Sequence, residues 1–262
     1  MLDNVKKSYP RPGLTPLNVL GGLDVEVEEG ALLSILGPSG CGKSTLLNII
    51  NGLDDATSGT VTLAGKTVTT KTRSDVKIGV VFQQPRLLNW RSVADNVALP
   101  LRELGLPHDE IQFRVHKYLD LVGLSEFAAY YPLQLSGGMQ QRVSLARGLA
   151  IEPNLLLADE PFSALDEFSA RKLRQEFVRI WDQTGTTILF VTHSIREAVF
   201  LSTRMLVITA RPTHTYLDLT VDVPHPRKPE DDRLFELEKS VTHDFMRMEE
   251  QAEQEKERVG AL

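Results

Sequence analysis

Short apolar runs alternate along the chain with longer stretches whose apolar residues recur at helical spacing. Nearly continuous apolar runs cover residues 31–36, 155–158 and 187–191. Their length is typical of strands that are buried in a sheet. Further strand patterns are found at residues 59–63, 78–82 and 205–208. Strands that alternate with helices in this way predict an α/β layer fold with a mainly parallel core sheet.

The segment from residue 92 to residue 148 has a helical pattern. Within it, Ile111, Val115, Tyr118 and Val122 are spaced to share one apolar face. We interpret residues 92–148 as a helical subdomain inserted between strands. Another predicted helix lies between the apolar runs at 155–158 and 187–191, and it carries Leu173, Phe177, Ile180 and Trp181.

The last part of the chain is highly charged and carries one apolar stripe. Several prolines after Pro212 precede the stripe, which consists of Leu234, Leu237, Val241, Phe245 and Met248. This spacing predicts an amphipathic helix, and we divide the chain into a domain over residues 1–222 and a helical tail over 223–262. The stripe can pack on its own domain or bind a partner. The first alternative is favoured because most such stripes pack within their own chain.

Composition and charge narrow the classes of function. The 262 residues are 42% hydrophobic and 24% charged, as in ordinary globular proteins. From Arg227 onward there are 7 basic and 11 acidic residues, so about −2 of the net charge of −6 belongs to the rest of the chain. A nucleic-acid binder would usually show a basic surplus. The N-terminus lacks the apolar core of a signal peptide, so we expect a cytoplasmic chain whose membrane role requires a partner.

A glycine-rich segment, Gly37-Pro-Ser-Gly-Cys-Gly-Lys-Ser44, lies between a predicted strand and a predicted helix. It matches the phosphate-binding pattern G-x-x-x-x-G-K-[ST], whose backbone N–H groups surround phosphate oxygens. We expect Lys43 to pair with the β- and γ-phosphates of ATP, and the Ser44 hydroxyl to coordinate Mg²⁺. The predicted contact residues are Gly37, Pro38, Ser39, Gly40, Cys41, Gly42, Lys43, Ser44 and Thr45. Cys41, the single cysteine, is interpreted as a small inert side chain.

Polar residues follow three other predicted strands. Asp159 and Glu160 come directly after the run at 155–158, where the carboxyl edge of a parallel sheet would face the phosphates. Asp159 would bind magnesium directly or through water, and Glu160 would act as the general base for the attacking water. His193 follows the strand at 187–191 and would orient that water or carry a proton. The amide of Gln83, after the strand at 78–82, can contact both magnesium and water.

These motifs, together with Leu135–Arg142 and Ser163-Ala-Leu-Asp166, resemble in order and spacing the ATP-binding cassette (ABC) ATPases. The resemblance extends from about Tyr9 to about Pro212. It implies the P-loop NTPase fold of that family, with a mainly parallel core sheet, an N-terminal antiparallel β subdomain and an inserted helical subdomain.

The resemblance also implies a head-to-tail homodimer with two composite ATP sites. Ser136, Gly137 and Gly138 would contact the γ-phosphate held by the opposite subunit. This is physically reasonable because a helix predicted from Gly138 would offer its N-terminal N–H groups to an anion. Asp166 would link the two sites, and Tyr9, followed by a longer loop at 10–16, would stack on adenine.

Within the family, residues 80–97, 159–166 and 210–212 resemble the importer ATPases for nitrate, sulfonate and taurine. This implies an ATP-hydrolysing subunit that is peripheral at the cytoplasmic face of the inner or plasma membrane. It would work with an integral membrane permease and a solute-binding protein, and it would energise uptake of a small solute, such as an anion. Leu87, Leu88 and Trp90 would receive a short helix of the permease, unless they pack locally within the helical subdomain.

Two other functions fit the sequence less well. A soluble ABC ATPase that acts on nucleic acid or ribosomes would resemble chains with two cassettes, a long coiled coil or zinc-binding cysteines, and this sequence has none of these. No nucleic-acid partner is therefore expected. A regulatory module that binds ATP without turnover is disfavoured because Glu160 and His193 are both present.

Overall fold

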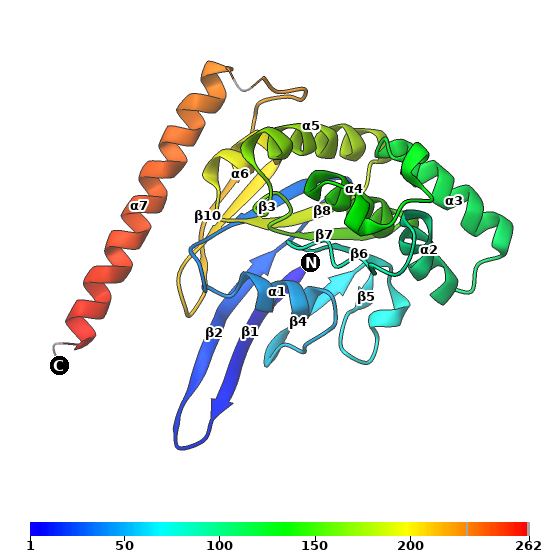
Figure 1. Ribbon diagram of the computed structural model, residues 1–262. Helices are drawn as coiled ribbons and strands as arrows, with labels where there is room; N and C mark the ends of the chain where they lie inside the picture. The colour runs from blue at the N-terminus through cyan, green and yellow to red at the C-terminus, as the bar shows by residue number, and fades with distance from the viewer. Residues whose placement is uncertain (229, 261–262) are drawn as a thin grey trace. The chain divides into compact units, whose positions relative to one another are not determined.

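The computed structural model describes residues 1–228 and 230–260 (Figure 1). The chain consists of two compact units. The first unit comprises Met1–Asp75 and Val191–Leu262, and the second comprises Val76–Phe190. In sequence, the second unit is therefore an insertion in the first. The predicted site residues are distributed over both units, which are described separately below.

The first unit contains an antiparallel sheet with the strand order β2-β1-β4-β5. These strands are β1 (Leu2–Arg11), β2 (Leu14–Val25), β4 (Ser58–Leu63) and β5 (Lys66–Thr67). The sheet confirms the predicted N-terminal antiparallel subdomain. The prediction of a long loop at residues 10–16 was wrong, because β1 and β2 stay paired as far as Arg11 and Leu14. Gly13 adopts φ +73°, and this lets a two-residue turn close the hairpin.

The same unit contains parallel strands. β3 (Leu32–Leu36) pairs in parallel with β9 (Arg204–Ile208), and β10 (Thr215–Thr220) adds to β9 in antiparallel direction. Two helices belong to this part, α1 (Lys43–Ile50) and α6 (Ile195–Leu201), and α6 packs on β3. The sequence pattern did not reveal α6 or β10.

The second unit contains the parallel strands β7 (Leu155–Asp159) and β6 (Ile78–Val81). Strand β8 (Ile188–Thr192), which follows β7 in the sheet, begins in this unit, and its last two residues belong to the first. The helices of the second unit are α2 (Val93–Glu103), α3 (His108–Leu121), α4 (Gly137–Ala150) and α5 (Glu167–Thr184). Short 3₁₀ turns occur at Ser125–Phe127 and Pro132–Gln134, and one at Arg73–Asp75 lies in the first unit. Helices α2, α3 and α4 contact one another, which confirms the helical pattern after residue 92. The predicted α/β class with parallel core strands is also confirmed.

The C-terminal helix α7 (Asp232–Gly260) packs within the first unit. Leu234, Val241 and Met248 follow one another at intervals of seven residues and are buried in a cluster with residues of α6, β9 and the segment after β10. Leu237 and Phe245 pack against the same cluster. The structure therefore confirms that the apolar stripe packs on its own domain. The last two residues of the predicted tail, 261 and 262, lie outside the described residues.

The buried guanidinium of Arg227 anchors the segment that leads to α7. It donates hydrogen bonds to backbone carbonyls at the end of α6 and in the segment after β10, namely those of Val199, Phe200, Ser202, Val221 and Val223. Burial lowers the pKa of Arg227 to about 10, so the group stays charged at neutral pH. A cation at this place also satisfies the carbonyls that a helix C-terminus leaves without partners.

Within residues 1–228 and 230–260, no helix combines the length and the apolar character that a membrane span requires.

Gly79 in β6 lies against α4 in a position that has no room for a side chain. A Cβ there would be 2.3 Å from the carbonyl oxygen of Gly148 and 2.8 Å from Leu156 Cδ1. We expect Gly79→Ala to lower the free energy of unfolding by about 1–3 kcal/mol, because the strand or the helix must move. Urea unfolding followed by circular dichroism measures this change.

Gly138→Ala is the matched control, because its Cβ would meet Ser169 Cβ at an ordinary distance of 3.7 Å. This variant should unfold at the same urea concentration as the wild type. An equal loss in both variants would contradict the explanation by close packing at Gly79.

Candidate functional site

The glycine-rich loop joins β3 to α1, as the sequence predicts. Gly42 is the N-cap of α1 and adopts φ +127°, a backbone conformation that other residues rarely reach. A Cβ at this position would also lie 2.8 Å from Val19 Cγ1. The helix starts at the next residue, so the N–H groups of its first turn point toward the loop. This arrangement can hold phosphate through backbone donors.

Lys43 is buried at the start of α1, and its ammonium group lies within the loop. Its Nζ donates to the carbonyl oxygens of Gly37 at 2.8 Å and Pro38 at 3.1 Å. An ammonium group has three N–H donors, and these carbonyls accept two of them. Ser44 is exposed in the first turn of the same helix. The ammonium group of Lys43 and the hydroxyl of Ser44 therefore belong to consecutive residues at the N-terminus of α1.

Thr213 contacts the phosphate loop through its side chain, and no pattern in the sequence predicts this contact. Its side chain is fully buried, and its hydroxyl donates to the carbonyl of Cys41. Its backbone N–H donates to Val19 O at 2.9 Å, and its carbonyl accepts from Gly21 N–H at 2.9 Å. The Cys41 side chain is 2% exposed, and burial raises the pKa of its thiol although Lys43 acts in the opposite direction. Both findings agree with an inert side chain at Cys41.

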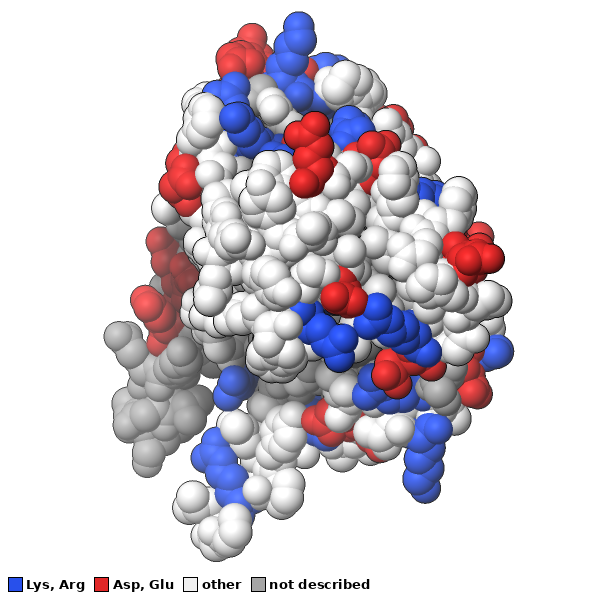
Figure 2. All heavy atoms as spheres, turned by 45° about the vertical axis from the view of Figure 1, so that its right-hand side comes forward, with Lys and Arg blue, Asp and Glu red and all other residues white. Residues whose placement is uncertain are grey.

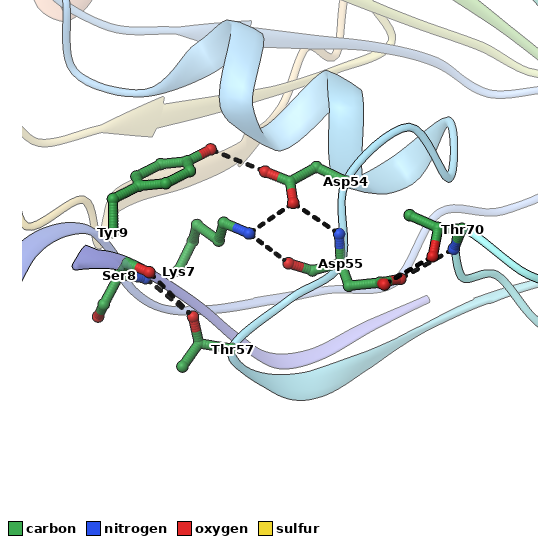
Figure 3. A network of polar contacts seen from close by, with 7 residues as sticks. All are labelled: Lys7, Ser8, Tyr9, Asp54, Asp55, Thr57 and Thr70. Atoms are coloured by element: carbon green, nitrogen blue, oxygen red, sulfur yellow. Dashed lines mark hydrogen bonds and ion pairs between the residues drawn. The ribbon is translucent and has the colours of Figure 1, made fainter.

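Tyr9 lies near the end of β1, where its side chain is 36% exposed. Its hydroxyl donates to Asp54 Oδ2 at 2.8 Å, and its ring is approached by Lys7 (Figure 3). Burial and Asp54 raise the pKa of Tyr9, whereas the Thr45 side chain, in the first turn of α1, acts to lower it. The structure therefore brings the predicted adenine contact to the phosphate loop. Lys7 and Asp54 were not predicted to take part, although the interval of two residues between Lys7 and Tyr9 placed both on one strand face.

His193 directly follows β8 and is exposed. Hydrogen bonds hold the backbone on both sides of it. The Thr192 hydroxyl donates to Glu197 Oε2 at 2.8 Å and accepts from Ser194 N–H at 3.0 Å. Ser194 Oγ caps α6 by accepting from Glu197 N–H at 3.3 Å. The buried pair Thr192 and Glu197 thus fixes the turn that carries the histidine.

Asp159 ends β7, and Glu160 follows it, which confirms their predicted place at the carboxyl edge of a strand. Both are partly buried. Glu160 adopts φ +43° immediately before Pro161, and a left-handed backbone costs a non-glycine residue on the order of 1–2 kcal/mol. Its carbonyl accepts hydrogen bonds from both the N–H and the hydroxyl of Ser163. Backbone strain that the surroundings maintain in this way is found mostly at functional sites.

Gln83 is exposed two residues beyond the end of β6. The segment around it is attached to α4. The Gln141 side chain donates to the carbonyl of the residue preceding Gln83 at 2.9 Å. The Arg147 guanidinium donates to the carbonyls of Pro85 at 2.7 Å and Arg86 at 2.9 Å. Side chains of α4 therefore hold the backbone on both sides of Gln83.

Helix α4 begins at Gly137, one residue earlier than the sequence indicated, with Ser136 as its N-cap. Ser136 Oγ accepts from Met139 N–H at 3.3 Å. Ser136 and Gly137 are exposed, and Gly138 is partly exposed. Because Gly137 and Gly138 have no side chains of their own, they leave the N–H groups at the start of the helix uncovered by a Cβ. These N–H groups can donate hydrogen bonds to an anion that another molecule presents.

Asp166 is the N-cap of α5, and its Oδ1 accepts from Ser169 N–H at 3.0 Å. Hydrogen bonds from Ser169 hold the pKa of this carboxyl below its usual value. The residue therefore has a structural function within its own chain. Its part in linking two ATP sites stays a prediction.

The predicted site residues belong to two groups. Those of the first unit are Tyr9, residues 37–45 and His193. Those of the second unit are Gln83, residues 136–138, Asp159, Glu160 and Asp166.

Comparison with known proteins gives a consistent picture. Residues 20–163 match the model of the family described as ABC transporter. The chain is 38% identical to the aliphatic sulfonates import ATP-binding protein SsuB of Bacillus cereus, over 94% of this chain and 95% of that one. It is 46% identical to the taurine import ATP-binding protein TauB of Rhizobium johnstonii, over 75% and 74%. It is also 43% identical to the bicarbonate transport ATP-binding protein CmpC of Synechococcus elongatus, over 87% of this chain and 34% of that one.

A similar solved structure is the dimeric post-hydrolysis state of the ATP-binding cassette MJ0796, bound to ADP and phosphate. The TM-score is 0.72 at 35% identity, and the match covers 85% of this chain and 99% of the other.

Proposed function

The chain belongs to the ABC transporter family of ATP-binding ATPases, and we propose that it powers the import of a small solute through a separate membrane permease. The observation that carries this proposal is the exposed N-terminus of α4, which begins with Ser136 and two glycines. Such a helix end suits a phosphate that a second subunit presents. If a second subunit presents the phosphate, one chain can use both its own phosphate loop and the N-terminus of α4 to bind nucleotide.

In the proposed mechanism, residues of the first unit hold ATP. The N–H groups of the loop and the first turn of α1 surround the β- and γ-phosphates, and Lys43 neutralises part of their charge. Tyr9 stacks on the adenine. Glu160 accepts a proton from the water that attacks the γ-phosphate in line, and His193 orients that water.

The side chains proposed to hold Mg²⁺ are the Ser44 hydroxyl, the Gln83 amide and the Asp159 carboxylate. All three offer oxygen ligands, which this hard cation prefers. Only one of them is charged, and Mg²⁺ sites commonly combine one or two carboxylates with water and substrate phosphates. The donor set therefore fits magnesium. When bound, the ion neutralises charge on the β- and γ-phosphates.

Two chains are proposed to pair head to tail, so that Ser136, Gly137 and Gly138 of one chain donate to the γ-phosphate held by the other. The dimeric state of the similar cassette MJ0796 supports this pairing. Asp166 lies at the start of α5, where it would connect the two sites. Hydrolysis in such a pair requires both chains, because each site takes donors from two subunits.

The cargo is proposed to be a small anion of the sulfonate, nitrate or bicarbonate type, delivered by a solute-binding protein. The names of the relatives from Bacillus cereus and Synechococcus elongatus support this class, and they name different anions. Specificity then belongs to the permease and the binding protein. We place the chain at the cytoplasmic face of the membrane, held there by the permease.

Large apolar side chains on the second unit support a permease contact. Trp90 is 73% exposed and Leu133 is 77% exposed. Their segments lie together, because Val93 N–H donates to Tyr130 O at 2.8 Å. Leu87 and Leu88, which were predicted to join this contact, are only partly exposed. Large apolar side chains that are exposed on neighbouring segments are typical of protein contacts.

The surface charge does not favour the alternative of a soluble cassette that acts on nucleic acid. On the face drawn in Figure 2, basic and acidic side chains are interspersed around a broad area that carries neither. Binding to a phosphate backbone usually requires a continuous basic surface.

Copurification with a permease tests the proposed function. The tagged full-length chain is isolated from its own cells in mild detergent, its partners are identified by mass spectrometry, and its ATPase activity is assayed. We expect a multi-span membrane protein with the wild type and its loss with Trp90→Glu, because a charge cannot enter an apolar contact. Phe113→Glu on α3, where the wild-type side chain is 63% exposed, is the control that should retain the permease. Recovery with DNA-repair or ribosomal proteins instead would favour the soluble alternative.

A further inference from the structure

Lys7 and Tyr9 lie on the same face of β1, because side chains two residues apart on a strand point the same way. The Lys7 ammonium lies 4.8 Å from the centroid of the Tyr9 ring. Lys7 is only 9% exposed, whereas Tyr9 is 36% exposed. The ammonium therefore occupies one face of the ring and leaves the other face as the surface that a ligand can reach.

Asp54 connects these two side chains, as Figure 3 shows. Its Oδ2 accepts from the Tyr9 hydroxyl at 2.8 Å, and its Oδ1 accepts from Lys7 Nζ at 2.5 Å. The N–H of Asp55 donates to the same Oδ1 at 2.8 Å, and Lys7 Nζ also donates to Asp55 O at 2.7 Å. Three donors thus fix the carboxylate, and the carboxylate in turn fixes the ring and the ammonium.

The protonation states agree with this geometry. Burial tends to raise the pKa of Asp54, but hydrogen bonds from Lys7 and Tyr9 outweigh it and keep the pKa below its usual value. Burial and the hydrogen bond to Asp54 raise the pKa of Tyr9, although a hydrogen bond with Thr45 acts in the opposite direction. The phenol therefore stays protonated and gives its only O–H donor to Asp54.

From this arrangement we infer that Lys7 and Asp54 are positioning residues, which hold the Tyr9 ring with one face open to the base of the nucleotide and its hydroxyl withheld from that base. The inference rests on the proposed ATP site. The base is then recognised by the face of the ring alone, without a hydrogen bond from the hydroxyl. Because every base has a π-face, such recognition contributes affinity with little selectivity among bases.

A comparison of ATP with inorganic tripolyphosphate separates this function from that of the phosphate loop. Both ligands engage the loop, but only ATP has a base. Affinities of the full chain for both ligands are measured by calorimetry, and kcat and KM for ATP are measured separately. We expect Tyr9→Ala to weaken ATP binding by about 5- to 150-fold, because that is the range for loss of one stacked base, and to leave tripolyphosphate binding unchanged.

Asp54→Ala should weaken ATP binding by about three- to tenfold and leave tripolyphosphate binding unchanged. The Tyr9 ring stays on β1 in this variant but loses the hydrogen bond that holds its hydroxyl. The change should appear in KM and not in kcat. In the Tyr9→Ala background, the Asp54→Ala change should have no further effect on ATP affinity, because two residues that act through one contact are not additive. Asp54→Asn should recover part of the affinity, because the amide oxygen still accepts from the tyrosine.

Asp55→Ala is the matched control. The Asp55 carboxylate is bonded to the N–H and hydroxyl of Thr70, at 2.8 and 2.7 Å, and not to Tyr9. This variant should bind ATP and tripolyphosphate as the wild type does.

The inference is overturned if Asp54→Ala binds ATP like the wild type, if it loses tripolyphosphate to the same extent, or if its effect persists in the Tyr9→Ala background. Failure of the proposed ATP function looks different. In that case the wild-type chain would bind neither ligand, or it would bind both equally well, so that the base contributed nothing.

Discussion

Replacement of Glu160 by Gln is expected to lower steady-state ATP hydrolysis by about 10²- to 10⁴-fold, which is the usual contribution of a general base. The amide matches the carboxylate in shape but cannot take a proton from water. The backbone of Glu160, at φ +43°, is equally strained for either side chain, so the fold should not change. ATP should still bind, and chains trapped in the ATP state should accumulate as dimers. Phosphate release at saturating ATP and size-exclusion chromatography with ATP measure the two effects.

Glu167→Gln is the control for this variant. Glu167 begins α5, and its carboxylate pairs with Arg174 at 2.6 Å. Its replacement should leave hydrolysis near the wild-type rate. Unchanged hydrolysis in Glu160→Gln would show that another group is the base. A loss of ATP binding in that variant would show that the change disturbs the site itself.

Gly138→Asp is expected to abolish ATP-driven pairing and to reduce hydrolysis by at least about 100-fold, while a single chain binds ATP as before. A carboxylate at the start of α4 would face the γ-phosphate of the partner, and juxtaposed like charges cost several kcal/mol. The fold should tolerate the side chain, because a Cβ at Gly138 meets its nearest neighbour at 3.7 Å. The measurements are ATP affinity of the isolated chain and dimer formation in the Glu160→Gln background.

Gly138→Ala separates charge from size at the same position. It should retain pairing and much of the activity, because it adds a methyl group without charge. A loss of ATP affinity in the isolated Gly138→Asp chain would mean that α4 contacts ATP within its own subunit. The head-to-tail arrangement would then be wrong.

Features determined by neighbouring residues were predicted correctly. The phosphate loop was predictable because an apolar strand, glycines at fixed spacing and a helix occur within about 20 residues of one chain segment. The buried face of α3 followed from helical periodicity, and Ile111, Val115 and Tyr118 are indeed buried. The strand ends that carry Asp159 and His193 were recognised for the same reason.

Features that depend on distant partners were missed. Strand β10 exists because it pairs with β9, and its alternation of polar and apolar residues is too weak to predict it alone. Asp54 lies 47 residues from Lys7, so no local pattern could reveal the contact between them. The buried hydroxyl of Thr213 supports a loop 172 residues earlier. Each of these features depends on a contact between segments that are far apart in the sequence, so the local sequence could not predict it.

The packing of α7 limits how the chain can be shortened for experiments. A chain that ended before Asp232 would uncover Val199 and Met205 and leave an apolar surface prone to aggregation. The C-terminal part of α7 can be modified more safely, because the side chains of Gln251 and Glu253 are exposed. A fluorophore can therefore be attached at either position without opening the core.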